Sequence, residues 1–296
     1  LSRDHLDYHQ NMAEYAAAKQ RLFSFTSLQA AVVNADDEFG QALLLYLNNH
    51  QMTCIEYSCK DAQANLYATD ITSTARGLQF NLHIQQQQLS IQSRLLGKFN
   101  VENMLATAAV LSLLGWSASE IAQGLNQLVG VNGRMQLLAS SLKPSVVIDF
   151  AHTPDALSKA LHGMRQHMDS TSRLWCVFGC GGDRDSGKRP LMGQIASEMA
   201  DKIVLTDDNP RGESSMQIIE QIQAGCPVGT DIHIEADRQR AIEYAVLDSA
   251  LEDMVLIAGK GHEQYQEVSG VKTPFNDYEI AMQALQKRHS ATRVTV

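Results

Sequence analysis

Hydrophobic positions in the first 130 residues alternate between helix-like and strand-like spacing. One predicted helical face consists of Met12, Tyr15, Ala16, Lys19, Leu22 and Phe23. A short buried strand over 30–34 and a helix over 39–48 follow. Alternation at Leu78, Phe80, Leu82 and Ile84 resumes at Leu89, which predicts a hairpin whose solvated end is 85–88. Helices are expected over 100–114 and 118–128.

The second half of the chain has a different pattern, in which short apolar runs alternate with helical periods. The predicted strands are 146–150, 174–179, 202–206, 232–235 and 254–258. Repeated strand–helix units predict a parallel sheet with helices on both faces. The periodicity lapses over 130–144, where Gly, Asn, Ser and Pro gather, so we expect domains at 1–133 and 134–296.

Polar or glycine-rich segments follow four of these strands. They are Asp149–Asp155, Gly179–Asp185, Asp207–Arg211 and Gly259–Glu263. Ligands of such folds bind outside the carboxyl ends of the strands. The four segments therefore predict one binding rim.

Composition narrows the class of protein. The chain has 296 residues, which suggests about two domains, and a net charge of −9 without a dense Lys/Arg block. Nucleic-acid binding is therefore disfavoured, and the strand-length apolar runs predict no membrane insertion. Five cysteines at unremarkable spacings and no visible signal peptide favour a reduced, cytoplasmic protein. The first residue is Leu, so we expect a piece of a longer chain.

The segment Gly179–Asp185 leads into Ser186-Gly-Lys-Arg-Pro190. Glycines permit close backbone approach, and free N–H groups with Lys188 and Arg189 favour an anion. A tight strand-to-helix turn is the simpler alternative. The segment is not a phosphate-binding loop of the Gly-x-x-x-x-Gly-Lys-Ser/Thr type, which occurs nowhere in the chain.

Two other rim segments carry side chains suited to an amino acid. Asp208-Asn-Pro-Arg211 places a rigid turn before a guanidinium that can grip a carboxylate, although a solvated loop arginine remains the alternative. Glu263 in Gly259-Lys-Gly-His-Glu263 could receive an ammonium group. A dinucleotide dehydrogenase is set aside, since Asp149–Asp155 contains no glycine.

Several residues permit two interpretations. Lys19 is either a lysine that extends along an apolar stripe to solvent, or a buried, chemically used amine near the Asp4-His5-Leu-Asp7 cluster. Asn100 is suited to cap the helix that it begins, and Gly133-Arg134 could form only a turn. Cys176 and Cys180 are expected to be buried core residues.

Together these motifs resemble the Mur ligases. The residues that carry the resemblance are Leu1–His9 with Tyr15–Lys19, Gly97–Asn103, Gly133-Arg134, Asp149–Asp155, Gly179–Pro190, Asp208–Arg211 and Gly259–Glu263. The last two motifs narrow the resemblance to the branch of the family that adds meso-diaminopimelate. The implied fold is α/β, with part of a central ATPase domain followed by a Rossmann-like C-terminal domain that has a mostly parallel sheet.

The resemblance also implies roles for individual residues. Lys19 matches a carbamylated lysine that supports Mg²⁺, and His5 matches a metal-associated histidine; both are implied to be catalytic. The residues implied to lie near the nucleotide are Asn100, Asn103, Arg134, Asp149 and His152. Those implied to form the diaminopimelate pocket are Arg184, Asn209, Arg211, Gly259 and Glu263.

The implied activity is ATP-dependent amide-bond formation that adds meso-diaminopimelate to UDP-N-acetylmuramoyl-L-Ala-D-Glu through an acyl phosphate, in peptidoglycan synthesis. The implied cofactors are Mg²⁺ and ATP as co-substrate, and the protein is expected to be a monomer. The family's phosphate loop and uridine-binding domain precede Leu1, so this piece by itself is expected to be inactive. The alternatives are a non-catalytic module that binds amino acid or nucleotide, a lysine-adding muramyl ligase, or a folylpolyglutamate synthase.

Overall fold

The computed structural model describes residues 11–74, 77–138 and 143–294, and it divides the chain into two compact units. Unit 1 comprises Leu1–Thr72, Leu78–Ser93 and Lys98–Leu128. Unit 2 comprises Ser73–Gly77, Arg94–Gly97 and Val129–Val296. The main division thus falls between Leu128 and Val129, and each unit is described by itself.

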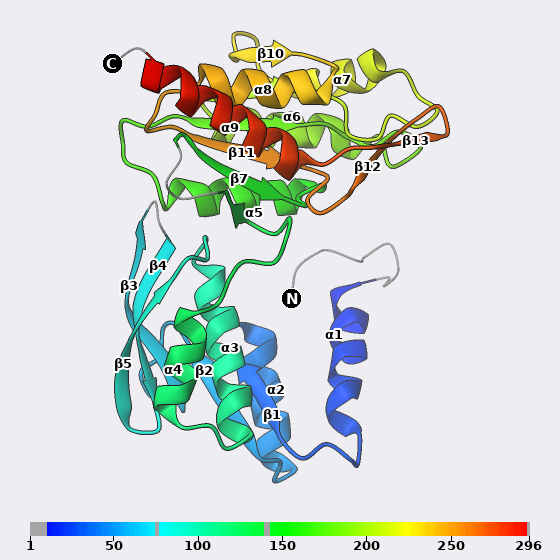
Figure 1. Ribbon diagram of the computed structural model, residues 1–296. Coiled ribbons are helices and arrows are strands. Elements are labelled where there is room, and N and C mark those ends of the chain that lie inside the picture. The colour runs from blue at the N-terminus through cyan, green and yellow to red at the C-terminus, as the bar shows by residue number, and fades with distance from the viewer. Residues whose placement is uncertain (1–10, 75–76, 139–142, 295–296) are drawn as a thin grey trace. The chain divides into compact units, whose positions relative to one another are not determined.

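Unit 1 is built on a five-stranded sheet in the order β1-β2-β3-β4-β5 (Figure 1). Strands β1, β2 and β3 pair in parallel, whereas β4 and β5 form an antiparallel hairpin. The strands are β1 Ala31–Asn34, β2 Cys54–Ser58, β3 Leu66–Thr74, β4 Gly77–Ile84 and β5 Gln87–Ser93. The helices are α1 Met12–Gln20, the 3₁₀ helix η1 Arg21–Ser24, α2 Glu38–Asn49, α3 Phe99–Leu113 and α4 Ala118–Asn126.

Most of the elements predicted in this unit are present, and the exceptions have local causes. The hairpin is confirmed, with its turn at Gln85 and Gln86. Strands β2 and β3 were missed, because neither shows a long run of alternating apolar residues. The prediction that Asn100 caps its helix is wrong. Lys98 occupies the cap position without a side-chain bond, and it already has helical angles, so α3 begins before Asn100.

Unit 2 is a six-stranded sheet in the order β10-β9-β8-β11-β7-β6, parallel except for the antiparallel edge strand β6. This confirms the expected α/β fold with a mostly parallel sheet. The strands are β6 Gln136–Leu137, β7 Ser145–Asp149, β8 Leu174–Phe178, β9 Lys202–Leu205, β10 Ile232–Ile234 and β11 Met254–Ala258, with a separate hairpin β12 Tyr265–Val268 and β13 Val271–Pro274. The helices are α5 Pro154–Arg165, α6 Lys188–Met199, α7 Ser215–Gln223, α8 Arg238–Asp248 and α9 Asp277–Val294.

Alternate residues of the central strands pack into two separate cores. Val147 and Leu256 face a cluster completed by side chains of α5, α6 and α7, whereas Val146 and Val255 face one completed by α8 and α9. Because both faces are covered, β8 and β11 are buried along their whole length. The side chains that remain available for chemistry therefore lie at the strand ends.

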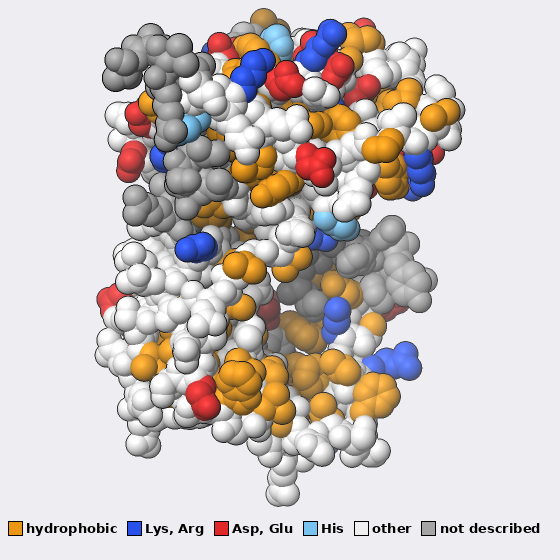
Figure 2. All heavy atoms as spheres, viewed as in Figure 1, with side chains coloured by type: hydrophobic (Ala, Val, Ile, Leu, Met, Phe, Trp, Pro, Cys, Tyr) orange, Lys and Arg blue, Asp and Glu red, His pale blue; other side chains and the backbone are white. Residues whose placement is uncertain are grey.

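The surface of unit 1, the membrane-spanning potential of the helices and the state of the cysteines complete the description. Hydrophobic side chains gather over the helices of unit 1 (Figure 2), where Leu114 and Trp116 are exposed. Within the described residues, no helix is both long and apolar enough to cross a membrane. All five cysteines are free, and Cys176 and Cys180 are buried as expected.

Candidate functional site

The four polar segments singled out in the sequence follow β7, β8, β9 and β11. These strands are parallel, and β11 lies between β7 and β8, with β9 beside β8. Parallel strands bring their carboxyl ends to one edge of a sheet. The prediction of a single rim within unit 2 is therefore confirmed.

The segments after β8 and β9 are joined by hydrogen bonds. Gly182 N–H donates to the Asn209 carbonyl at 2.9 Å, and Arg211 Nη1 donates to the Gly182 carbonyl at 2.8 Å. A Cβ at Gly182 would lie 1.9 Å from the carbonyl oxygen of Pro210, so only glycine permits this approach. The two segments thus form one continuous surface.

An ion pair between the buried Arg189 and the partly exposed Glu213 fastens the same two segments. Arg189 is 0% exposed, and its Nη1 and Nη2 each lie 2.8 Å from a carboxylate oxygen of Glu213. Glu213 also accepts the N–H of Asp183 at 2.6 Å. These bonds lower the pKa of Glu213 to about 2. The prediction that Arg189 faces an anionic ligand is wrong, because its side chain is committed to this pair.

Asn209 and Glu263 come together as the amino-acid hypothesis requires. Asn209 Nδ2 donates to Glu263 Oε2 at 2.9 Å, and the fully buried Lys260 Nζ lies 2.9 Å from the same oxygen. Glu263 is partly buried, which raises its pKa, but hydrogen bonds from Lys260 and Asn209 outweigh burial and lower the pKa overall. Glu263 is therefore held as a carboxylate.

Asp208 is a site residue that sequence reasoning quoted within a motif but gave no role. It is 8% exposed, and burial raises its pKa, while Arg238 and Lys260 act to lower it. Gly259 has a φ of +115°, and a Cβ there would lie 2.5 Å from Asp208 Oδ2. Gly259 thus contributes space and backbone to the pocket.

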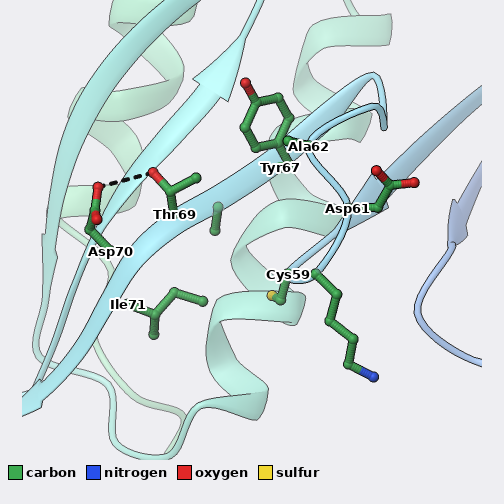
Figure 3. Close-up of a pocket in the computed structure, with 9 residues that line it drawn as sticks. Cys59, Asp61, Ala62, Tyr67, Thr69, Asp70 and Ile71 are labelled. Atoms are coloured by element: carbon green, nitrogen blue, oxygen red, sulfur yellow. Dashed lines mark hydrogen bonds between the residues drawn. The ribbon is translucent and has the colours of Figure 1, made fainter.

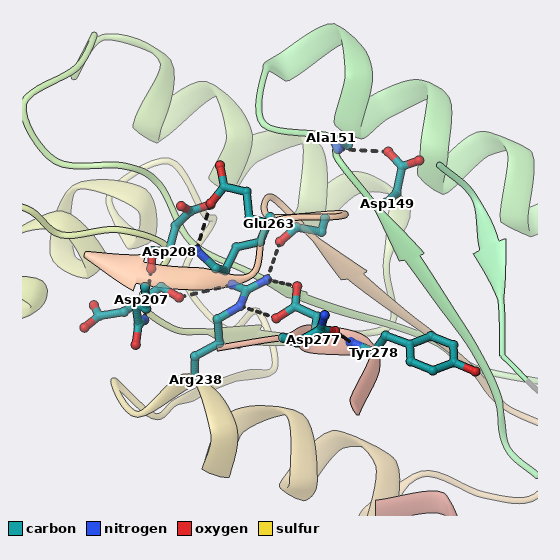
Figure 4. A network of polar contacts seen from close by, with 12 residues as sticks. Asp149, Ala151, Asp207, Asp208, Arg238, Glu263, Asp277 and Tyr278 are labelled. Atoms are coloured by element: carbon teal, nitrogen blue, oxygen red, sulfur yellow. Dashed lines mark hydrogen bonds and ion pairs between the residues drawn. The ribbon is translucent and has the colours of Figure 1, made fainter. Parts of the chain in front are cut away.

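Beneath these carboxylates lies a fully buried ion pair (Figure 4). Arg238 Nε and Nη2 each lie 2.8 Å from an oxygen of Asp277, and Arg238 also donates to the carbonyl groups of Asp207 and Ala258. Ala258 ends β11, and Asp207 lies two residues beyond the end of β9, so the pair holds two rim segments at once. No sequence motif had marked either residue.

Arg211 and Arg184, the two arginines of the predicted amino-acid pocket, differ in how firmly their side chains are held. Arg211 donates to Gly182, lies 3.6 Å from Glu267, and has a φ of +49°, so its guanidinium is held against the loop that follows β8. It is close enough to Glu263 to lower the pKa of that carboxyl. Arg184 is exposed on the same loop.

Arg134, Asp149 and His152 gather at the end of β7. The Arg134 guanidinium lies 4.7 Å from the centre of the Phe150 ring, and the His152 ring lies 4.6 Å from it. Asp149 accepts the N–H groups of Met135 and Ala151, although burial raises its pKa. These side chains form an aromatic, cationic face next to an acceptor.

The segment after β11 touches both groups of residues. Its Lys260 and Glu263 contact Asn209, while the His262 ring lies 5.4 Å from Phe150. A Cβ at Gly133 would lie 2.2 Å from the His262 nitrogen. The segment after β11 thus links the two groups of predicted site residues, and Phe150 and His262 join the candidate residues.

The remaining predicted residues lie in unit 1. Asn100 and Asn103 are on α3, where Asn103 Nδ2 donates to Asn100 Oδ1 at 3.0 Å. Lys19 is exposed on α1, and Nζ lies 5.6 Å from the Tyr15 ring centre. The burial invoked for this amine is therefore not observed. His5, with Asp4 and Asp7, falls outside the described residues.

Unit 1 also contains a cavity of about 300 Å³ beside β3 (Figure 3). Its lining includes Cys59, Lys60, Asp61 and Tyr67, and none of the predicted site residues. Burial raises the pKa of Cys59 to about 12, so this thiol is not a nucleophile at neutral pH.

Two family models match successive parts of the chain. The Mur ligase middle domain model matches residues 1–111, and the Mur ligase, glutamate ligase domain model matches residues 133–261. The UDP-N-acetylmuramoyl-L-alanyl-D-glutamate--2,6-diaminopimelate ligase of Pseudomonas aeruginosa is 46% identical over 285 residues, which are 96% of this chain and 58% of that protein.

Solved structures extend the comparison. One of a UDP-N-acetylmuramoyl-L-alanyl-D-glutamate--2,6-diaminopimelate ligase is 40% identical, with a TM-score of 0.73 over 98% of this chain and 59% of that chain. The MurF ligase of Thermotoga maritima, solved in complex with ADP, is 13% identical and shares the fold, with a TM-score of 0.65 over 98% of this chain and 60% of that chain. This chain spans less than two thirds of the length of these relatives. Since the two domain models follow one another along it in order, and the identity extends through both, the chain belongs to the Mur ligase family.

Proposed function

We propose that this chain is the part of an ATP-dependent ligase that adds meso-diaminopimelate to UDP-N-acetylmuramoyl-L-Ala-D-Glu in peptidoglycan synthesis. The observation that carries the proposal is the rim of unit 2, where Arg211 follows β9 and Glu263 follows β11, the two strands that flank β8. The Arg211 guanidinium lies close enough to lower the pKa of the Glu263 carboxyl. The P. aeruginosa relative supports the proposal, because its name states that it joins UDP-N-acetylmuramoyl-L-alanyl-D-glutamate and 2,6-diaminopimelate.

The chemistry proceeds in two steps. The side-chain carboxylate of D-glutamate attacks the γ-phosphorus of ATP, which forms an acyl phosphate and releases ADP. The amine of diaminopimelate then attacks the acyl carbon. A C–N bond forms, the C–O bond to phosphate breaks, and the amine loses a proton.

The residues of the rim hold the incoming amino acid by the end that does not react. Arg211 binds its distal carboxylate through paired N–H donors, with Arg184 beside it. Asn209 and Glu263 recognise the distal zwitterionic centre, where the Glu263 carboxylate faces the ammonium group, and Gly259 contributes backbone to the pocket. Lysine has no distal carboxylate, so it forgoes the charge-assisted bonds that Arg211 offers, and the pocket discriminates against lysine.

We assign the aromatic end of the rim to the nucleotide. Arg134 and His152 flank Phe150, which offers cationic and aromatic surface to a base or phosphate, and Asp149 offers an acceptor. Asn100 and Asn103 of unit 1 are assigned to the same ligand from the family motif alone.

Mg²⁺ remains a proposal from the family resemblance, as do the roles of His5 and of Lys19 as a carbamate. Across the described ranges there is no group of three or more His, Cys, Asp or Glu side chains that could hold a metal. We therefore assign no step of the reaction to the ion. A cytoplasmic location and a monomeric state are likewise proposed.

The test is an assay of ATP-dependent joining of labelled meso-diaminopimelate to the UDP-linked dipeptide, with the full-length protein and with L-lysine as competitor substrate. Product and ADP must appear in equal amounts, and only with diaminopimelate. Preference for lysine identifies a lysine-adding ligase instead. Binding of the amino acid or nucleotide without product identifies a binding module.

A further inference from the structure

A buried lysine connects two side chains of the proposed amino-acid pocket. Lys260 is 0% exposed, and its Nζ lies 2.9 Å from Asn209 Oδ1 and 2.9 Å from Glu263 Oε2. Asn209 Nδ2 donates to the same Glu263 oxygen at 2.9 Å. The three side chains form a closed triangle of hydrogen bonds, and the Glu263 N–H donates to the Lys260 carbonyl at 3.0 Å to close the loop.

This triangle determines which way the Asn209 amide points. The Lys260 ammonium and the N–H of Glu267 can only donate, and both lie 2.9 Å from Oδ1. The amide oxygen must therefore face them, which directs Nδ2 at Glu263. Without Lys260, Oδ1 keeps only the N–H of Glu267 and loses its charged donor, so the amide is held less firmly.

The charges of the pocket also depend on Lys260. Asp208 and Glu263 are two carboxylates near one ammonium, and Lys260 favours the charged form of both. Its ammonium also lies 5.7 Å from the Tyr265 ring centre, a cation–π arrangement.

We propose that Lys260 is a positioning residue, which acts through Asn209 and Glu263 to hold the pocket that receives an ammonium group of a zwitterionic amino acid. The inference rests on the proposed function and deepens it. All the contacts above engage Glu263 through Oε2, so Oε1 is left to accept from the ligand.

A role in charge alone makes the opposite prediction. A lysine that only neutralised Glu263 would repel the ligand's ammonium group, and its removal would tighten binding. A positioning lysine makes binding weaker when it is removed. Lys260 makes one charge-assisted hydrogen bond to Asn209 and one to Glu263, and their loss should raise Kd roughly 10- to 100-fold.

The experiment measures Kd for meso-diaminopimelate by calorimetry with the 296-residue chain, for wild type and Lys260→Met. Lys272→Met is the matched control, because its Nζ also lies over the Tyr265 ring, at 4.4 Å, but the side chain is exposed. We expect weaker binding in Lys260→Met and wild-type binding in the control. Unchanged or tighter binding in a folded Lys260→Met protein overturns the proposal.

A double variant tests whether Lys260 acts through Glu263. If it does, Lys260→Met weakens binding less in the Glu263→Gln background than in wild type. If the losses of binding in the two single variants simply add in the double variant, Lys260 does not act through Glu263.

A readout without ligand separates this inference from the proposed function. In the wild-type chain, the side-chain amide protons of Asn209 should exchange with solvent at least tenfold more slowly than those of the exposed Asn49. Equal rates overturn the inference, even if Lys260→Met does not fold. If the wild-type chain does not bind diaminopimelate, the proposed ligand fails, while the exchange rates still test whether the Asn209 amide is held in place.

Discussion

The two ends of the unit 2 rim are built in different ways. At the end proposed for the amino acid (the amino-acid end), Asn209 and Lys260 are buried and their polar atoms bond to one another. At the end proposed for the nucleotide (the nucleotide end), Arg134 and His152 are exposed and contact the face and edge of Phe150. One end is a network of directed hydrogen bonds, whereas the other is an aromatic surface with few bonds.

This difference matches what each ligand demands. Selecting one amino acid over a close analogue requires donors and acceptors in place before the ligand arrives, because a buried group left unpaired is costly. A base or phosphate can be held by stacking and charge, which tolerate small shifts. We therefore expect substitutions at the amino-acid end to have the larger effects.

The largest effect should come from the ion pair beneath the amino-acid end. Arg238→Met leaves Asp277 buried without its partner and frees two strand-end carbonyl groups. Removing one member of a buried pair costs about 3–5 kcal/mol in the free energy of unfolding. Urea denaturation of unit 2, followed by the near-UV signal of Trp175, measures it.

Arg240→Met is the matched control, because its side chain is 74% exposed and its pairing with Asp237 is long, at 3.9 Å. It should change the free energy of unfolding by less than about 0.5 kcal/mol. Equal losses in the two variants would contradict a structural role for the buried pair.

Arg211→Ala should have the next largest effect, on the choice of amino acid. Loss of a partly desolvated charged pair costs about 2–4 kcal/mol of transition-state binding, which lowers kcat/KM for diaminopimelate by about 30- to 1,000-fold. The loss for lysine should be far smaller, and KM for ATP should stay the same. Steady-state kinetics of the full-length protein with both amino acids measure it.

Glu267→Gln removes the 3.6 Å ion pair of Arg211 but leaves the guanidinium, and it should preserve the preference for diaminopimelate. If Arg211→Ala lowers kcat/KM equally for both amino acids, Arg211 supports the loop and does not recognise the substrate.

Arg134→Gln tests the nucleotide end and should have a smaller effect. Removing the cation above Phe150 costs about 0.5–1 kcal/mol at an exposed site, which raises KM for ATP roughly two- to fivefold. Selectivity between diaminopimelate and lysine should not change. A shift in that selectivity would show that the two ends are not separate in function.

The smallest effects should be those of pH on stability, and they should have opposite signs at the two ends. The pKa of Glu213 is lowered from 4.5 to about 2, so its stabilisation is present above pH 4.5 and lost as pH falls toward 2. The pKa of Asp149 is raised above 3.8 by burial, so its contribution favours folding in acid and is lost as pH rises through the raised pKa.

The free energy of unfolding between pH 7 and pH 3 checks these signs. The advantage of wild type over Glu213→Gln should shrink on acidification, and its advantage over Asp149→Asn should grow. Changes in the same direction for both would contradict the assigned causes.

The repeated strand–helix pattern of unit 2 was predictable, because buried parallel strands are continuous apolar runs and helices have a different period. The rim followed from it, since polar segments after four parallel strands must share an edge. Unit 1 was predicted less completely. Strand β2 contains Glu56 in a stretch of half-buried residues, so its sequence lacks a strand signal.

By itself, the sequence determined the fold class, the family and the place of Asn209, Arg211 and Glu263 on one rim, because these depend on local periodicity and on motifs. Only the tertiary structure decided that Arg189 is committed to Glu213, that Arg238 pairs with Asp277, and that Lys260 joins Asn209 to Glu263. Partners 24, 39 and 51 residues apart meet through the packing of whole elements. No local pattern specifies which charges will be buried together.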